Sequence, residues 1–146
     1  MTLRRLAPTT VVLLACANAL PACDGGARRE ATRLTDAVDR YRRASDASKA
    51  AARDAVSAVA CADSRVCDAK QACVAAIEPT TRALALKDEV SRRLVDLEQK
   101  RMAPDAPEAQ ALPGKLDEAE LLLKDGRAKM AICDARLTDL RVAFGG

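Results

Sequence analysis

Residues 109–144 read AQALPGKLDEAELLLKDGRAKMAICDARLTDLRVAF and carry the most regular hydrophobic pattern in the chain. Apolar and small residues recur along this segment at alternating intervals of three and four, which is the spacing of a coiled-coil seam. Pro113 and Gly114 are expected to bend the helix early, and the two glycines at positions 145 and 146 to end it. The seam comprises Ala109, Leu112, Leu116, Ala119, Leu123, Gly126, Met130, Cys133, Leu137, Leu140 and Phe144.

Two further helical patterns precede this segment, over residues 28–62 and 65–101. Asp63-Ser64 is the only break between them, and no glycine or proline enforces a turn there. Within the second pattern, Pro79 is expected to kink or split the helix, because proline lacks the backbone N–H that a helix interior requires.

A turn over residues 102–105 leads from the second pattern to the third. Asp105 and Glu108 have the spacing of a capping box, so we expect them to start the third helix.

The composition favours an all-α protein with a single domain in its 146 residues. The chain contains one Tyr, one Phe and no Trp, whereas sheets are enriched in aromatic side chains. Three helices of similar length joined by short turns predict an antiparallel up-down-up bundle with coiled-coil-like seams, about 50 Å long. Its domain would cover residues 28–146.

Two charged segments fit this arrangement. Residues 28–53 contain eight basic and four acidic side chains, and residues 105–125 contain six acidic and two basic ones. In an up-down-up bundle both segments lie at the same end, so we expect them to face one another. The basic segment could alternatively contact anionic lipid headgroups.

The amino-terminal segment has the parts of a secretory signal. Residues 1–5 are basic, and residues 6–20 are uncharged and mostly apolar, but too short to span a bilayer. The sequence Leu20-Pro-Ala-Cys23 then resembles the lipobox of bacterial lipoproteins. This resemblance, confined to the first 23 residues, implies that residues 1–22 are a signal peptide and that Cys23 carries the lipid. Residues 23–27 would form a short tether.

Two other cleavage sites compete with this one. Leu13-Leu-Ala-Cys16 is a better local match to the lipobox and would place the lipid on Cys16, whereas Ala17-Asn-Ala19 resembles an ordinary signal-peptidase site. Cleavage before Cys23 leaves four further cysteines, an even number, for disulfides in an oxidising compartment. Either rival leaves Cys23 as an unpaired thiol. The even number of remaining cysteines favours cleavage before Cys23. The sequence does not distinguish the inner from the outer membrane.

The four remaining cysteines can pair in three ways. In the bundle, Cys61 and Cys67 flank the first turn, while Cys73 and Cys133 fall at similar heights on antiparallel helices. We therefore predict Cys61–Cys67 and Cys73–Cys133, with Cys61–Cys73 and Cys67–Cys133 as the rival pairing. A copper(I) site made by Cys61, Cys67 and Cys73 near Met130 is the alternative to these disulfides.

Several classes of function are disfavoured. The chain has no histidine, the commonest general base and metal ligand, and it lacks the sequence motifs of common enzyme families. Removing Arg4 and Arg5 from 24 basic residues leaves 22 against 21 acidic ones, a balance that argues against nucleic-acid binding.

We therefore expect a non-enzymatic envelope lipoprotein without a cofactor. It would be anchored to a membrane through its N-terminal lipid, would face the periplasm or the exterior, and would act as a helical interaction or scaffold module. It would bind a protein partner or self-associate. A small-ligand or copper carrier that uses the bundle interior is the alternative.

Overall fold

A computed structural model of the chain describes residues 24–145, and all regular secondary structure in that range is helical. The expectation of an all-α protein is therefore confirmed. The signal peptide, Cys16 and Cys23 lie outside the described residues. The elements are α1 (Asp24–Arg43), a short 3-10 turn (Asp46–Ser48), α2 (Lys49–Ser57), α3 (Ser64–Glu98), α4 (Pro107–Gln110) and α5 (Leu112–Phe144).

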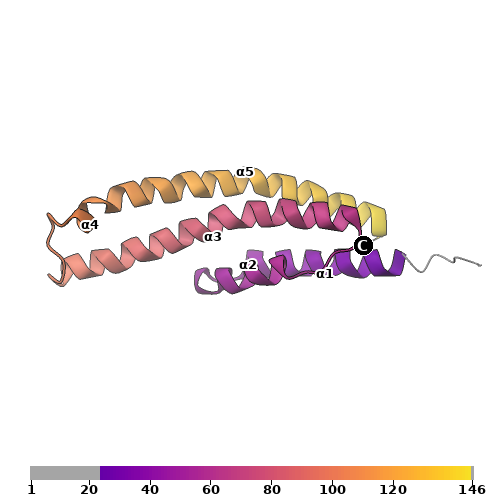
Figure 1. Cartoon of the computed structure of the whole chain (residues 1–146), viewed down its shortest axis with the longest axis horizontal. Helices are drawn as coiled ribbons and strands as arrows, with labels where there is room; N and C mark the ends of the chain where they lie inside the picture. The colour runs from indigo at the N-terminus through magenta and orange to yellow at the C-terminus, as the bar shows by residue number, and fades with distance from the viewer. Residues whose placement is uncertain (1–23, 146) are drawn as a thin grey trace, which may run out of the picture.

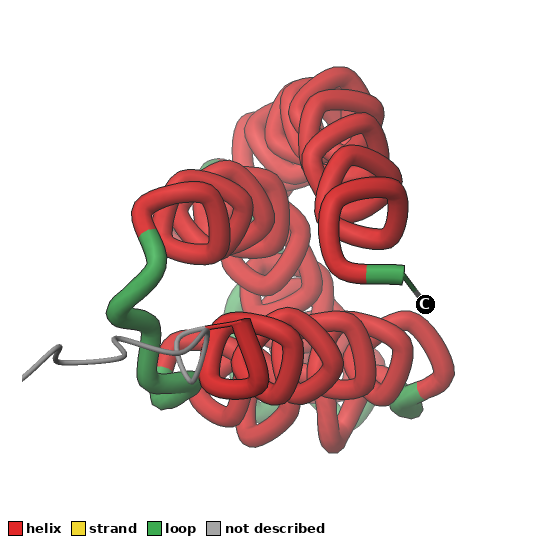
Figure 2. Tube along the Cα trace, turned by 90° about the vertical axis from the view of Figure 1, so that its right-hand side faces the viewer, coloured by secondary structure: helices red, strands yellow, loops and turns green. Residues whose placement is uncertain are grey.

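The two longest helices, α3 and α5, form an antiparallel hairpin, and α1 with α2 forms a second, shorter hairpin (Figure 1). Seen from the end where the C-terminus lies, α1 and α2 occupy one layer and α3 and α5 the other (Figure 2). The core lies between these layers and is built from aliphatic side chains, cysteines and Tyr41. Its largest fully buried members are Leu34, Val38, Val56, Val66, Cys73, Ile77, Cys133 and Leu137.

The helix predicted over residues 28–62 is broken, so the prediction of three long helices is wrong. The chain reverses direction between Arg43 and Lys49. In this turn the Ser48 hydroxyl donates to the Ser45 carbonyl oxygen at 3.0 Å, and Lys49 Nζ donates to the Tyr41 carbonyl oxygen at 2.7 Å. Short polar side chains that bond to the backbone in this way compete with helix continuation.

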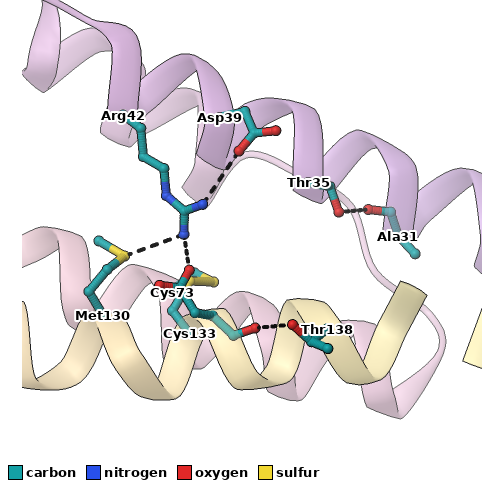
Figure 3. Close-up of polar contacts among 9 residues, drawn as sticks. Ala31, Thr35, Asp39, Arg42, Cys73, Met130, Cys133 and Thr138 are labelled. Carbon is teal, nitrogen blue, oxygen red and sulfur yellow. Dashed lines mark hydrogen bonds and ion pairs between the residues drawn. A yellow bond between two sulfur atoms is a disulfide. The ribbon is translucent and has the colours of Figure 1, made fainter. Parts of the chain in front are cut away.

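This reversal changes the direction of α1 relative to α5. Arg28 donates to the Gly145 carbonyl oxygen at 2.7 Å, whereas Arg42 contacts Met130 and Asp134 (Figure 3). The two helices are therefore antiparallel, and the basic segment lies beside the C-terminal half of α5. The expectation that residues 28–53 face residues 105–125 is wrong.

The prolines and the predicted cap also differ from expectation. Helix α3 continues through Pro79 without splitting, because seam residues on both sides of the proline are buried. Pro113 lies in the first turn of α5, where the missing N–H would have no helical partner anyway. Ala106, not Asp105, is the N-cap residue of α4, so the predicted capping box is absent there.

Residues 24–27 of the segment expected to form a tether belong to α1. The helix begins at Asp24, and Ala27 is already buried against the bundle. Because Arg28 reaches Gly145, the start of α1 and the end of α5 lie at the same end of the molecule. The connection between α3 and α5 lies at the opposite end (Figure 1).

Candidate interaction surface

The structure brings together Cys61 with Cys67, and Cys73 with Cys133, each pair joined by a disulfide. The first pair links the loop before α3 to its first turn, with Cα atoms 5.3 Å apart. The second links α3 to α5 through the core, with Cα atoms 4.6 Å apart. The long-range disulfide therefore sets the register between the two long helices.

The residues of the alternative copper site belong to two different disulfides and are not brought together as one set of ligands. Cys73 bonds to Cys133 rather than to the Cys61–Cys67 pair, and the Met130 sulfur lies 3.8 Å from Arg42. Within residues 24–145, no group of three or more His, Cys, Asp or Glu side chains is placed to hold a metal ion. In the disulfide-bonded form, no thiolate of these four cysteines is free to act as a ligand.

A cleft of about 230 Å³ lies between α1 and the end of α5. Its polar lining comes from both helices and includes Arg28, Thr32, Asp36 and Arg141. Most ligand sites occupy roughly 300–1,000 Å³, so this cleft is small for a carrier, whereas a surface hollow beside Cys61, Cys67 and Val74 measures about 630 Å³.

The α3–α5 hairpin extends well beyond α1 and α2 (Figure 1). The α1–α2 hairpin forms an ion pair with α3 at Glu78, which lies 3.0 Å from Arg53, and reaches Met130 on α5 through Arg42. We call the part beyond these contacts, residues 79–98 and 112–129 with their connection, the stalk. Twenty helical residues make it about 30 Å long.

One face of the stalk continues the surface that α1 and α2 cover elsewhere. On α5, Leu123 and Leu116 lie one and two heptads before Met130; on α3, Leu84 lies one heptad after Ile77, and Leu94 three heptads after Cys73. Ile77 and Cys73 are fully buried, whereas Leu94 and Leu116 are each 46% exposed. We call this surface the stalk face; its apolar residues are Leu84, Leu94, Val95, Leu116 and Leu123.

The opposite face of the stalk is closed by ion pairs between the two helices. Arg82 pairs with Glu118 at 2.6 Å, and Lys115 pairs with Glu89 at 2.5 Å. The hydrogen bond from Lys115, together with its charge, holds the pKa of Glu89 below its ordinary value of 4.5.

The charges beside the stalk face are not paired in the same way. Lys87, Glu98, Glu120 and Arg127 form no ion pair with any described residue. Arg127 and Glu120 lie one and two heptads before Asp134, which pairs with Arg42 of α1 in the other half. The stalk face is thus an apolar strip bordered by charges without partners.

Sequence reasoning missed this surface because it assumed a first helix long enough to cover the whole hairpin. The signal that could have revealed it is the Ala44-Ser-Asp-Ala-Ser48 run, whose short polar residues favour a turn. Once α1 ends there, the layer of α1 and α2 does not cover the far half of α3 and α5.

Comparison with protein families, curated proteins and solved structures found no match to this chain. Among the described helices, none combines the length and the hydrophobicity that crossing a membrane requires.

Proposed function

We propose that this protein is a lipid-anchored, non-enzymatic interaction module of a bacterial cell envelope, which presents the stalk to a helical protein surface. The observation that carries the proposal is the stalk face. Leu94, Val95 and Leu116 are 46%, 41% and 46% exposed, although residues at equivalent heptad positions form the core in the other half. Large apolar side chains exposed together on one face favour a protein-binding site.

The anchor is supported by the sequence and by cysteine parity. All four cysteines of residues 24–145 are used in disulfides, so Cys23 has no partner thiol within that range. Lipidation at the lipobox-like sequence would use this remaining sulfur. Because α1 begins at Asp24, at the same end as Gly145, the lipid would lie at the end opposite the stalk.

This geometry sets the distance between the lipid anchor and the binding surface. Helix α3 contains 35 residues and spans about 50 Å. With the lipid at one end, the stalk is the part of the molecule farthest from the anchor. The protein would therefore hold its binding surface at a defined distance from its point of attachment.

The anchor is tested by intact mass measurement on protein extracted from membranes. We expect a diacylglyceryl group on Cys23 and release of a Cys23→Ser variant from the membrane fraction. A Cys16→Ser variant serves as the matched control and should stay in that fraction. Lipid on Cys16 would contradict the proposed cleavage site.

The binding surface is tested by placing a photo-crosslinking amino acid at Leu116 in the full chain in cells. We expect crosslinked protein adducts from this position. The same amino acid at Val142, which is 82% exposed on α5 away from the stalk, is the control and should give none. Equal labelling from both positions would contradict a specific surface.

A further inference from the structure

The two disulfides differ in how far the surrounding protein encloses them. Cys73 and Cys133 are fully buried between α3 and α5. Cys61 and Cys67 are both partly exposed, and both line the surface hollow of about 630 Å³ between the end of α2 and the first half of α3. A thiolate from outside can therefore reach one disulfide of the folded protein and not the other.

The loop that carries Cys61 is held by hydrogen bonds as well as by its disulfide. Lys70 Nζ donates to the Val59 carbonyl oxygen at 2.8 Å, and the N–H of Ala62 donates to Glu30 Oε2 at 2.8 Å. These bonds tie the loop to α3 and to α1 on either side of the cysteine. Opening the disulfide, whose sequence separation is only 6, leaves these attachments in place.

From this contrast we propose that the Cys61–Cys67 disulfide is a thiol-exchange site, which reacts reversibly with a cysteine thiolate of a second, dithiol-bearing protein. The Cys73–Cys133 disulfide stays formed throughout and keeps α3 linked to α5. This activity goes beyond the proposed function and depends neither on the lipid nor on the stalk face.

The exchange consists of two balanced steps. The partner's thiolate attacks Sγ of Cys61, and the S–S bond to Cys67 breaks as the new one forms, so that Cys67 leaves as a thiolate. The partner's second thiolate then attacks the partner's own sulfur in the mixed disulfide and releases Cys61. This protein gains two electrons and the partner is oxidised to a disulfide. The two protons lost by the partner's thiols balance the two taken up by the released sulfurs.

The surroundings of the two sulfurs make Cys67 the better leaving group. Cys67 lies in the first turn of α3, where the positive end of the helix dipole stabilises a thiolate. Lys70, one turn further along and lining the same hollow, adds a positive charge. Cys61 lies before the helix and packs against the buried core, an apolar setting that disfavours a thiolate. Because the more stable thiolate leaves faster, attack on Cys61 is favoured.

The acidic side chains around the disulfide do not neutralise Lys70. This lysine is partly buried and forms no ion pair with any residue of the described range. Asp68, beside Cys67 in the sequence, is exposed, so water and salt screen its charge. Two further carboxylates already have partners of their own, namely Asp63 with Arg65 and Glu78 with Arg53.

The exchange is tested on the folded full-length chain in detergent, with reduced glutathione as the probe thiol. Samples are quenched with acid, free thiols are alkylated, and the modified peptides are mapped by mass spectrometry. We expect Cys61 and Cys67 to react at least about tenfold faster than the buried pair, since exchange requires access to the sulfur. The glutathione should be found on Cys61. Cys73 and Cys133 are the internal control.

A charge variant separates an exchange site from a disulfide that is merely exposed. Lys70→Gln should slow the reaction with glutathione about threefold, because the leaving thiolate loses a neighbouring positive charge. Lys70→Arg keeps the charge and should react at the wild-type rate. Circular dichroism of both variants checks that the helices remain folded.

A protein probe tests whether the hollow admits a folded partner. The probe is a thioredoxin-class protein whose second, resolving cysteine is replaced by serine, so that its reaction stops at the mixed disulfide. We expect a covalent complex with the wild-type chain on a non-reducing gel. The Cys61→Ser/Cys67→Ser variant keeps the buried disulfide and is the matched control, which should form no complex.

Four results would overturn the inference: equal reaction rates of the two disulfides in the folded chain, glutathione on Cys67 instead of Cys61, an unchanged rate in Lys70→Gln, or no complex with the protein probe. None of them bears on the lipid at Cys23 or on the photo-crosslinker at Leu116, so the proposed function is tested separately.

Discussion

Lys100 ends α3 in a backbone conformation that usually belongs to glycine. Its φ is 57°, in the left-handed region. The N–H of Lys100 donates to the Leu97 carbonyl oxygen at 3.0 Å, and the N–H of Arg101 donates to that of Asp96 at 2.8 Å. These two bonds define a Schellman motif, in which glycine avoids the steric cost of a Cβ.

We expect Lys100→Gly to raise the free energy of unfolding by about 1 kcal/mol, because left-handed backbone costs most L-residues roughly that amount. Thermal or chemical denaturation checks the value. Arg101→Gly is the control at the next position: it relieves no left-handed strain and removes the ion pair of Arg101 with Asp96 at 2.7 Å, so it should not stabilise the protein. Destabilisation by Lys100→Gly would show that the lysine side chain has a separate role.

At Gly126, α3 and α5 approach each other closely, which the seam pattern alone does not reveal. A Cβ there would lie 3.3 Å from the Ala76 carbonyl oxygen and 3.4 Å from the Thr80 amide nitrogen. The spacing placed Gly126 correctly on the inner face of its helix. That α3 approaches so closely at this point depends on tertiary packing.

At the scale of elements, the back of the stalk is held by pairs such as Glu89 with Lys115. The pKa of Glu89 is lowered from 4.5, first by the hydrogen bond from Lys115 and then by its charge. A lowered folded-state pKa means that the pair contributes stability above about pH 4.5, and that this contribution is lost as the pH falls through the folded-state value.

We therefore expect Glu89→Gln to lower the melting temperature at pH 7 and to have progressively less effect below pH 4.5. The side chains of both partners are about one third exposed, so salt should also reduce the difference. Melting curves of the two proteins across pH 2.5–7 check this. A difference that does not change with pH would mean that Glu89 acts through packing rather than through its charge.

The elements themselves were predictable where a long periodic pattern dominates. The segment 65–101 covers α3 apart from its first residue, Ser64, and the segment 109–144 contains α5; their seam residues Cys73, Ala119 and Leu137 are buried. The prediction of a single helix over residues 28–62 was wrong because Ser48 forms local hydrogen bonds with the side chain and the carbonyl oxygen of Ser45, where the chain turns. A periodicity that continues across a turn does not reveal that the chain reverses there.

At the scale of the whole molecule, the two disulfides should differ in their effect. Cys73–Cys133 closes a loop with a sequence separation of 60, whereas Cys61–Cys67 closes one of only 6. In the chain-entropy model these contribute about 4 and about 2 kcal/mol. The longer loop restricts the unfolded chain more, and its disulfide also lies in the core.

We expect the Cys73→Ser/Cys133→Ser variant to melt at a clearly lower temperature than the Cys61→Ser/Cys67→Ser variant. Both should be compared at one protein concentration and without reductant, so that the disulfide each variant keeps stays formed. Equal melting temperatures would contradict the expectation that the disulfide between α3 and α5 stabilises the protein more than the Cys61–Cys67 disulfide does.

The sequence by itself determined the helical class, the two long helices and the inner face of each, because these follow from composition and from local periodicity. It also led to the hypothesis of a lipid on Cys23, which stays a prediction. The tertiary structure decided that α1 and α2 turn back on themselves and cover only half of the α3–α5 hairpin. This coverage depends on where packing ends, which is a non-local property, and it leaves the stalk face open.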